Sequence, residues 1–295
     1  MTTTPQHRGA VTVIGLGAMG TVLARTLLQK GFTVTIWNRT AARAAGLTAE
    51  GALLAPDITA AVAASPIIIT CLSSYEATSH LLQTAAIDLT GKTIIEFCTG
   101  TPQDARNAQA WVTALGGSYL DGALMATPRQ IGQESTTILV AGATDTFQTA
   151  TAVLAALGGN VMYKGEAIGA AAAWDLGLLA SVFGMINGFM QGALLFESEG
   201  IPVNLLGNML VNMGPIIGEM VRHEGEVIVS GNYDHPESSL RTCAYTFDLL
   251  VKQANEAGID SSIPAFSQGL FKRALDAGYG EEQLGALIKV LRTQA

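Results

Sequence analysis

One carboxyl group stands apart in this sequence because its neighbours are apolar. Asp175 is the only Asp, Glu, Lys, Arg or His between Ala167 and Phe196. Burial in apolar surroundings disfavours a carboxylate and favours its protonated form, so a carboxyl group in such a place can donate a proton. The alternative is a structural aspartate that hydrogen-bonds to backbone or to another helix. If the segment is helical, the residues that share the face of Asp175 are Leu178, Leu179, Val182, Ile186 and Phe189.

A glycine-rich motif near the N-terminus has the spacing of a dinucleotide-binding turn. It follows the strand pattern VTVI and precedes an amphipathic helix, and a second strand pattern ends at Trp37. In this βαβ context the first glycine makes the turn, the second lets a pyrophosphate approach the backbone, and the third lets helix pack on strand. The free N–H groups at the helix N-terminus attract phosphate, although glycine-rich turns without a ligand also occur. The predicted dinucleotide-binding residues of this motif are Gly15, Leu16, Gly17, Ala18, Met19 and Gly20.

The residues after the second strand pattern indicate which dinucleotide binds. NAD sites place Asp or Glu there to bind the ribose 2′-hydroxyl. This chain has Asn38, Arg39 and Thr40, with Arg43 one turn further on. An acidic side chain would repel a 2′-phosphate, whereas arginine holds it with paired, charge-assisted hydrogen bonds. The sequence therefore favours NADP(H), and the alternative is a solvated arginine at a strand end.

Up to about residue 165, strand patterns alternate with helix-length segments. These elements must position the residues named above. This alternation predicts an α/β domain with a doubly wound, largely parallel sheet, in which the last strands are free to pair antiparallel. The expected strands are 11–14, 33–37, 67–72, 93–98, 118–124, 136–142 and 160–164.

After residue 165 the strand patterns stop and only helical patterns follow. The predicted domains are a dinucleotide-binding domain (1–165), an apolar interdomain helix (166–198) and an all-helical domain for dimerisation and substrate binding (199–295). Helical patterns in the last domain cover 204–224, 239–257, 264–277 and 281–292.

Three glycines recur every four residues along the interdomain helix, at Gly184, Gly188 and Gly192. Glycine inside a helix costs up to about 1 kcal/mol relative to alanine, so this spacing predicts that another helix approaches closely. We expect that helix to come from a second subunit, although a helix of the same chain would satisfy the spacing. The helical domain is also too small to bury its own apolar faces. The glycine spacing and the small domain together predict an intertwined, domain-swapped homodimer whose sites use both chains.

Composition and charge exclude several classes of protein. The chain has 295 residues, of which 49% are hydrophobic and 14% charged, so two domains with extensive burial are expected. A net charge of -8 argues against nucleic acid and anionic membrane surfaces as partners. The three cysteines lack metal-ligand spacing and the N-terminus lacks the apolar stretch of a signal peptide, so we expect reduced thiols, no metal site and a cytoplasmic location. The stretch 167–196 is long enough to span a membrane, but its polar residues and the lack of basic flanks favour a helix buried in protein.

The motifs GLGAMG, WNRT and CTGTP, followed by a long helix after the last strand pattern, resemble the β-hydroxyacid dehydrogenase superfamily. Within that superfamily the chain is more similar to the imine reductases and reductive aminases. This resemblance extends nearly from end to end and includes YLDGALMATPRQIG (119–132), GEAIGAAAAWDLGLL (165–179) and AGYGEEQLGALIKVLR (277–292). It implies an N-terminal Rossmann domain that binds NADP(H).

The resemblance also implies a role for Asp175. The β-hydroxyacid dehydrogenases use a lysine on the connecting helix, whereas here the helix has none and Lys164 precedes it. Imine reductases often carry aspartate or tyrosine at that position, and Asp175 falls on it. A C=N bond accepts hydride well when its nitrogen is protonated, so this carboxyl could supply the proton or stabilise an iminium. Phe183 and Thr99 stand where reductive aminases often have tyrosine and asparagine, which argues against efficient coupling of a free ketone with an amine.

The sequence therefore predicts an NADPH-dependent imine reductase that acts on a small-molecule substrate, a cyclic imine that is apolar around the reacting bond. The alternatives are a carbonyl or hydroxyacid oxidoreductase and a catalytically silent NADP-binding protein. Asp121, after a strand pattern, is interpreted as a structural hydrogen-bonding residue at the domain surface or the pocket edge. The loop residues expected to border the nicotinamide half of the cofactor are Leu72, Ser73, Ser74, Cys98, Thr99 and Thr101.

Overall fold

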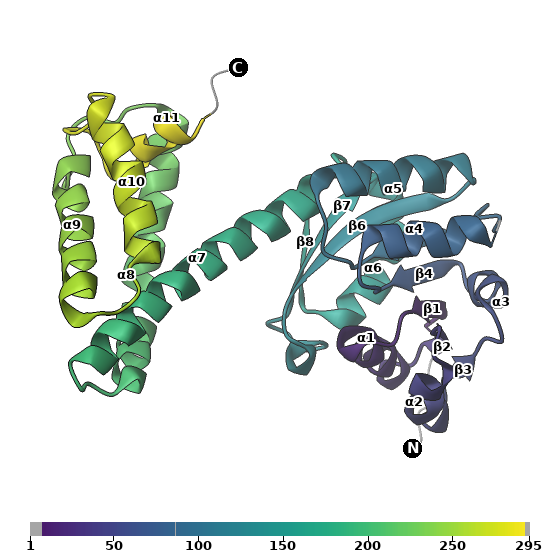
Figure 1. Ribbon diagram of the computed structural model, residues 1–295. Helices are drawn as coiled ribbons and strands as arrows, with labels where there is room; N and C mark the ends of the chain where they lie inside the picture. Colours follow the sequence, from purple (N-terminus) through teal and green to yellow (C-terminus); the bar gives the residue numbers. More distant parts are fainter. Residues whose placement is uncertain (1–7, 86, 293–295) are drawn as a thin grey trace. The chain divides into compact units, whose positions relative to one another are not determined.

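The computed structural model describes residues 8–85 and 87–292, and the chain divides into two compact units. The first unit ends at Ala180 and the second begins at Ser181. The long helix α7 (Ala170–Ser198) contains this boundary (Figure 1). Each unit is described by itself below.

The first unit is built on an eight-stranded sheet within the described residues, with strand order β3-β2-β1-β4-β5-β6-β7-β8. All neighbouring strands pair in parallel except β6 and β7, which are antiparallel. The strands are β1 (Ala10–Ile14), β2 (Thr33–Trp37), β3 (Leu53–Leu54), β4 (Ile67–Thr70), β5 (Thr93–Glu96), β6 (Ser118–Met125), β7 (Thr137–Gly142) and β8 (Asn160–Tyr163).

Helices cover both faces of this sheet, because alternate side chains of the buried strands point to opposite faces. Ile67 and Ile69 of β4 belong to a core that also contains α1 and α6, whereas Ile68 belongs to a core that contains α4 and α5 (Figure 1). The helices of this unit are α1 (Ala18–Gln29), η1 (Ala41–Ala44), α2 (Ala45–Ala49), α3 (Ile58–Ala63), α4 (Tyr75–Thr84), α5 (Pro102–Ala114), η2 (Pro128–Gln130) and α6 (Thr144–Leu157).

The predicted α/β fold with a doubly wound sheet is confirmed, and each predicted strand overlaps an observed one. The antiparallel pairing permitted for the last strands occurs between β6 and β7. The two-residue edge strand β3 was missed, since it is too short to form a recognisable alternating pattern. At the neighbouring strands β1 and β4 the order of the sheet reverses, which in open α/β sheets creates a crevice at the carboxyl ends of the strands.

The second unit is helical and has a small core of its own around Val227, Leu240 and Phe271. The predicted helix over 204–224 continues further and contains Pro215. The helical pattern over 281–292 corresponds to a shorter helical segment, a 3-10 turn followed directly by one short α-helix. The helices after α7 are α8 (Val203–Ser230), α9 (Leu240–Ala257), α10 (Ser262–Asp276), η3 (Leu284–Leu287) and α11 (Ile288–Leu291).

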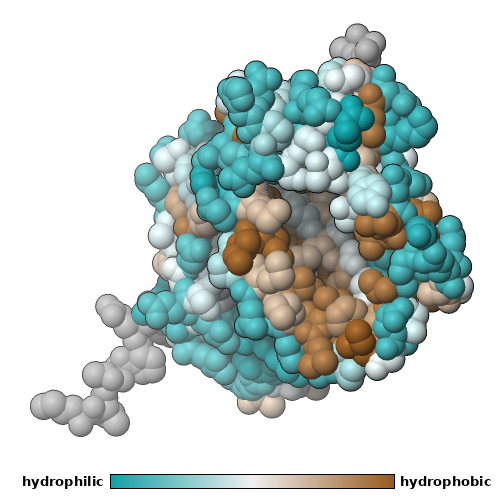
Figure 2. Space-filling model, turned by 90° about the vertical axis from the view of Figure 1, so that its left-hand side faces the viewer, coloured by the Kyte–Doolittle hydropathy of each residue, from teal (hydrophilic) through white to brown (hydrophobic). Residues whose placement is uncertain are grey.

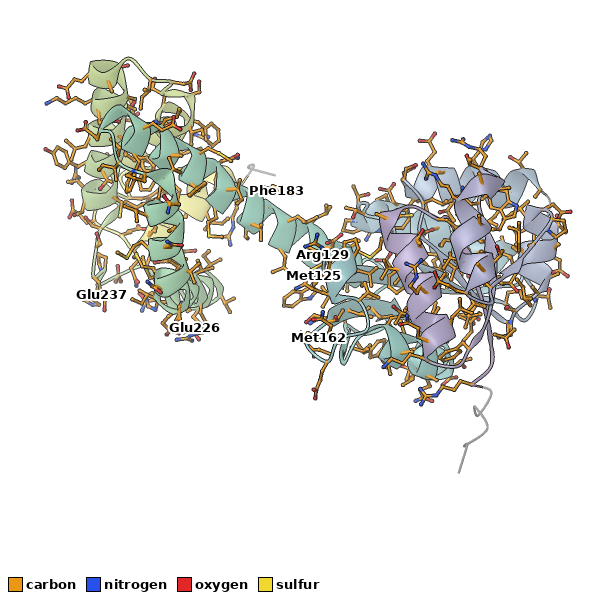
Figure 3. The ribbon with its side chains drawn as sticks, turned by 90° about the horizontal axis from the view of Figure 1, so that it is seen from below. Met125, Arg129, Met162, Phe183, Glu226 and Glu237 are labelled. Carbon is orange, nitrogen blue, oxygen red and sulfur yellow. The ribbon has the colours of Figure 1, made fainter. Side chains whose placement is uncertain are left out.

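Helix α7 is more exposed than its sequence suggested. We expected burial in protein, yet large apolar side chains along its middle are open in the single chain, and Phe183 is 60% exposed (Figure 3). By length and composition this helix could also cross a membrane. Of the three spaced glycines, Gly192 lies against Leu206 of α8 in the same chain, whereas the positions of Gly184 and Gly188 face open space. The close helix partner of Gly192 is therefore intrachain.

Candidate active site

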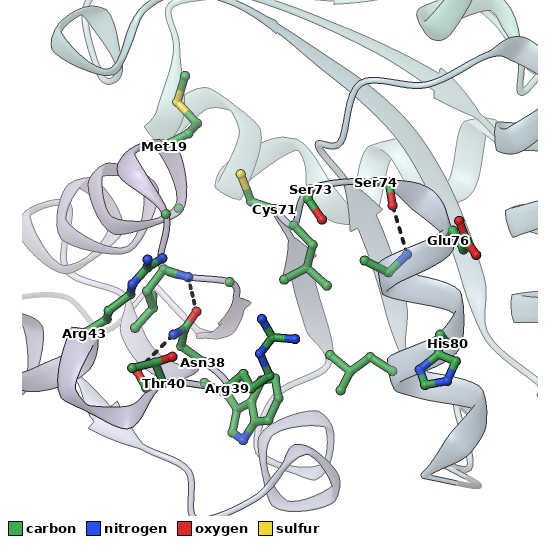
Figure 4. A pocket seen from close by; sticks show the side chains of 18 of the residues that line it. Met19, Asn38, Arg39, Thr40, Arg43, Cys71, Ser73, Ser74, Glu76 and His80 are labelled. Carbon is green, nitrogen blue, oxygen red and sulfur yellow. Dashed lines mark hydrogen bonds between the residues drawn. The ribbon is translucent and has the colours of Figure 1, made fainter.

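A cleft of about 1160 Å³ opens at the carboxyl ends of β1, β2 and β4, where the sequence predicted a dinucleotide (Figure 4). One wall is the glycine-rich turn and the start of α1, and the other is the loop after β4 with the start of α4. The sequence-predicted residues that line it are Gly15, Leu16, Gly17, Ala18, Met19, Gly20, Asn38, Arg39, Thr40, Arg43, Leu72, Ser73 and Ser74.

The glycines of the turn are required by its geometry. Gly15 has a φ of +98°, and a Cβ there would collide with the carbonyl oxygen of Cys71. A Cβ at Gly20 would collide with the carbonyl oxygen of Gly15, so this glycine allows α1 to pack on the turn. The position of Gly17 faces open space, and this residue precedes α1 without a side-chain cap. The uncapped first turn of α1 can therefore present N–H groups to an anion in the cleft.

Asn38 connects the glycine turn to the loop after β2. Its Oδ1 accepts a hydrogen bond from Leu16 N at 3.0 Å, and its Nδ2 donates to Thr40 O at 3.0 Å (Figure 4). Arg39 and Arg43 are exposed beside this connection, and neither forms a salt bridge with a carboxylate of the described residues. Their guanidinium groups are thus available to a phosphate.

Sequence reasoning missed the residues that α4 contributes to the opposite wall. Ser74 caps this helix by accepting from Ala77 N at 3.1 Å, and Glu76 and His80 follow one turn apart on the cleft side (Figure 4). Their helical spacing after the predicted loop was the available signal, since residues four apart share a helix face. The lining residues that were not predicted are Trp37, Cys71, Glu76, Ala77, Ser79, His80, Leu81 and Gln83.

Three predicted cofactor residues, Cys98, Thr99 and Thr101, do not line the cleft. The Sγ of Cys98 accepts from Leu72 N at 3.2 Å and donates to Leu72 O at 3.4 Å, so it supports the loop that does line it. Thr101 caps α5 through Asp104 N at 3.1 Å. Thr99 instead hydrogen-bonds to Asp175.

Asp175 is buried, with 6% of its surface exposed, although much of the helix around it is open. Burial raises the pKa of Asp175 above its ordinary value, and a hydrogen bond from the side chain of Thr99 opposes part of this rise. The residue lies outside the cleft lining, and a chain of contacts through Thr99 and Cys98 connects it to Leu72. A carboxyl group that retains its proton more readily than usual thus lies next to the loop behind the cleft.

Two further carboxyl groups are buried beneath this loop. Asp121, which we expected to be a structural hydrogen-bonding residue at the domain surface or the pocket edge, is only 1% exposed, so the surface placement was wrong. Its structural hydrogen bonds are confirmed, with Tyr75 and Ala172 N as the donors. It lies on β6 directly opposite Glu96 of β5, which is also buried. Desolvation raises the pKa of each of these two groups to about 7. Among the described residues no cluster of His, Cys, Asp and Glu could hold a metal ion.

Both halves of the chain match known protein families. Residues 10–165 match the family described as the NAD binding domain of 6-phosphogluconate dehydrogenase, and residues 167–293 match the NADPH-dependent reductive aminase-like C-terminal domain. The chain is 31% identical to an NADPH-dependent reductive aminase of Aspergillus oryzae, over 95% of this chain and 96% of that protein.

Solved structures agree with this similarity over almost the whole chain. A reductive aminase from Aspergillus terreus in complex with NADPH and ethyl levulinate is 35% identical, with a TM-score of 0.90 over 96% of this chain and 99% of that one. An imine reductase from Myxococcus stipitatus in complex with NADP+ is 31% identical, with a TM-score of 0.90 over 96% of this chain and 100% of that one.

Proposed function

Because this chain belongs to the imine reductase and reductive aminase family, we infer that it reduces imines to amines with NADPH as the hydride donor. It is an NADPH-dependent oxidoreductase. The observation that carries the mechanism is a buried carboxyl group, Asp175, hydrogen-bonded to the loop that supports the cofactor cleft.

We propose that Asp175 is the proton donor of this reaction. When bound in the cleft, NADPH would supply the hydride that reduces the imine carbon and would become NADP+. The proton of the Asp175 carboxyl goes to the imine nitrogen, so the products are the amine, NADP+ and a carboxylate that takes a proton from water. Protonation of nitrogen makes the carbon a better hydride acceptor, and general acid help of this kind contributes roughly 10²- to 10⁴-fold. If the carboxylate instead stabilises a preformed iminium by charge, the requirement for a transferable proton disappears.

We assign the two ends of the cofactor to the two ends of the cleft. The glycine turn and the first turn of α1 bind the pyrophosphate, and Arg39, Thr40 and Arg43 bind the 2′-phosphate of the adenosine. The loops that contain Leu72 and Cys98 border the nicotinamide. Thr99 and Thr101 then act from outside the cleft, the first by orienting Asp175 and the second by ordering the start of α5.

The proposed substrate is a cyclic imine with an apolar surface around the C=N bond. On α7 the side chains about one turn from Asp175 are aliphatic, at Ala171, Ala172, Leu178 and Leu179, and the aromatic Trp174 directly precedes it. Such a lining binds apolar carbon and offers few groups that would retain a free ketone and an amine together.

The activity is tested by the loss of NADPH absorbance when the purified enzyme is mixed with a panel of cyclic imines, followed by chiral analysis of the amines. We expect turnover that depends on both imine and NADPH. Oxidation of 3-hydroxyacids with NADP+ in place of imine reduction would favour a hydroxyacid dehydrogenase. Tight NADPH binding without turnover on either class would indicate a silent nucleotide-binding protein.

We also propose that two copies form an intertwined homodimer in the cytoplasm and complete each other's sites. The support is the open apolar surface of the helical part, visible as exposed hydrophobic residues in Figure 2. Exposed members of this surface include Met185 and Met190 of α7, and Met209, Ile216 and Met220 of α8. Patches of this kind usually mark an interface.

Sedimentation equilibrium should give twice the chain mass of 30.6 kDa. Met185→Glu should shift the protein toward the monomer, because it places a charge in the proposed interface. Met162→Glu is the matched control, because Met162 is an exposed methionine on β8 of the first unit, outside the proposed surface. A monomer at all concentrations would contradict the proposal.

A further inference from the structure

Asp121 of β6 accepts hydrogen bonds from two separate helices. Its Oδ1 accepts a hydrogen bond from the hydroxyl of Tyr75, the first residue of α4. Its Oδ2 accepts from Ala172 N of α7 at 3.0 Å. Both oxygens of this buried carboxyl group are therefore occupied by partners on helices that flank the proposed site.

The bond to Ala172 acts on the part of α7 that carries the proposed acid. The helix begins at Ala170, so Ala172 N is one of the first N–H groups, which have no acceptor within the helix. A carboxylate at this end is also favoured by the helix dipole. Asp175 follows Ala172 by less than one helical turn. Its carboxyl group is thus held from the sheet side by Asp121, through the helix backbone, and from the loop side by Thr99.

The two aspartates also interact through their charges. Burial is the main cause that raises the pKa of Asp121 to about 7, and the negative charge of Asp175 adds to it. The hydrogen bonds from Tyr75 and Ala172 act in the opposite direction. A charge interaction acts on both groups, so loss of the charge of Asp121 should let Asp175 give up its proton at lower pH.

The other titratable groups around Asp121 come from three places: Tyr75 of α4, Glu96 of β5, and Tyr119 of β6 itself. The pKa values of both tyrosines are raised by burial, so they stay neutral. Glu96 interacts with Asp121 by charge and accepts from Thr78 Oγ1 at 3.3 Å. None of these groups is a cation that would favour ionisation of the pair.

We propose that Asp121 is a positioning residue for imine reduction: through its bond to Ala172 N it holds the first turn of α7 so that Asp175 stays against Thr99. The inference depends on the proposed role of Asp175 as the proton donor. Asp121 itself stays buried beneath the loop and acts through Asp175.

The test is the dependence of kcat on pH for a cyclic imine, from about pH 5 to about pH 9, in variants that remove or weaken the charge of Asp121. Asp121→Asn keeps an acceptor for Ala172 N but removes the charge, so the alkaline fall in kcat should move to lower pH. Tyr75→Phe removes the hydrogen bond that lowers the pKa of Asp121, so Asp121 stays neutral to higher pH and exerts less charge on Asp175. The alkaline fall should therefore also move down, by less than in Asp121→Asn. Tyr119→Phe is the control, because its buried hydroxyl has no hydrogen-bond partner among the described residues.

A downward shift in both variants, larger in Asp121→Asn, with an unchanged profile for Tyr119→Phe, would support the inference. A purely structural role would lower kcat at every pH without moving the profile, and this result would overturn it. If Asp121→Asn does not fold, an unshifted profile in Tyr75→Phe is sufficient to overturn it. If Asp175→Asn loses activity but the profiles of the Asp121 and Tyr75 variants do not shift, only the proposed role of Asp121 is rejected. If Asp175→Asn keeps full activity, the proposed role of Asp175 as the proton donor is rejected.

Discussion

Asp175→Asn is expected to lower kcat on a cyclic imine by roughly two orders of magnitude, with the Kd for NADPH changed by less than about twofold. The amide retains the size of the carboxyl group and can still hydrogen-bond to Thr99, but it has no proton of suitable acidity to give. The residue does not line the cofactor cleft, so nucleotide binding should persist. Asp175→Ala should lose at least as much activity, because it also removes the bond to Thr99.

Glu166→Gln provides the matched control for this substitution. Glu166 is an exposed acid shortly before α7, and its Oε1 accepts from Thr144 Oγ1 at 2.9 Å outside the cleft. The same change from carboxyl to amide there should leave kcat and the Kd for NADPH as they are. Steady-state kinetics and fluorescence titration with NADPH measure both quantities. Wild-type turnover in Asp175→Asn would rule out any acid-base role of this residue.

Arg39→Ala is expected to reduce the preference for NADPH over NADH by about 10- to 100-fold. A hydrogen bond to a charged group contributes about 1.5–3 kcal/mol, which corresponds to this range of affinity. The loss should fall on the KM for NADPH, because NADH has no 2′-phosphate for the guanidinium to bind. Kinetics with both cofactors at saturating imine measure the effect.

Arg25→Ala is the control for the arginine substitution. Arg25 lies on α1 outside the cleft lining and pairs with Glu50 at 2.7 Å. Its removal changes the net charge by the same amount and should not change cofactor preference. An Arg39→Ala enzyme that retained the full preference for NADPH would show that the 2′-phosphate is recognised elsewhere, with Arg43 as the nearest other cation of the lining.

The cofactor half of the site was predictable from sequence because its signals are local. The turn that starts at Gly15 lies between a strand and a helix that are contiguous in the chain, and Arg39 lies two residues after the end of the next strand. The geometry explains why these residue types are needed: a Cβ at Gly15 or Gly20 would collide with backbone. Local patterns of this kind determine both the fold and the ligand.

The buried acids could not be recognised in the same way. Asp121 meets Tyr75 and Ala172, which are 46 and 51 residues away in the sequence, so its environment depends on the order of strands in the sheet. An isolated acidic residue in a strand pattern is more often at a surface, which led to the wrong placement of Asp121. The strand register that brings Glu96 opposite Asp121 is likewise a tertiary property.

The exposure of α7 shows a different limit of sequence reasoning. Its composition correctly indicated an apolar helix, but composition does not identify which surface covers it. Within one chain, Gly192 finds its partner in Leu206, while the surface around Phe183 stays open. The burial expected for this helix is therefore a property that we assign to the proposed dimer.

The most direct test of the central claim compares a neutral cyclic imine with its N-methyl iminium, which carries a permanent charge and needs no proton. Single-turnover hydride transfer from NADPH is measured for both substrates in the wild type and in Asp175→Asn. If Asp175 donates the proton, the variant should be slow on the neutral imine and close to the wild type on the iminium. Equal losses on both substrates would contradict proton donation by Asp175.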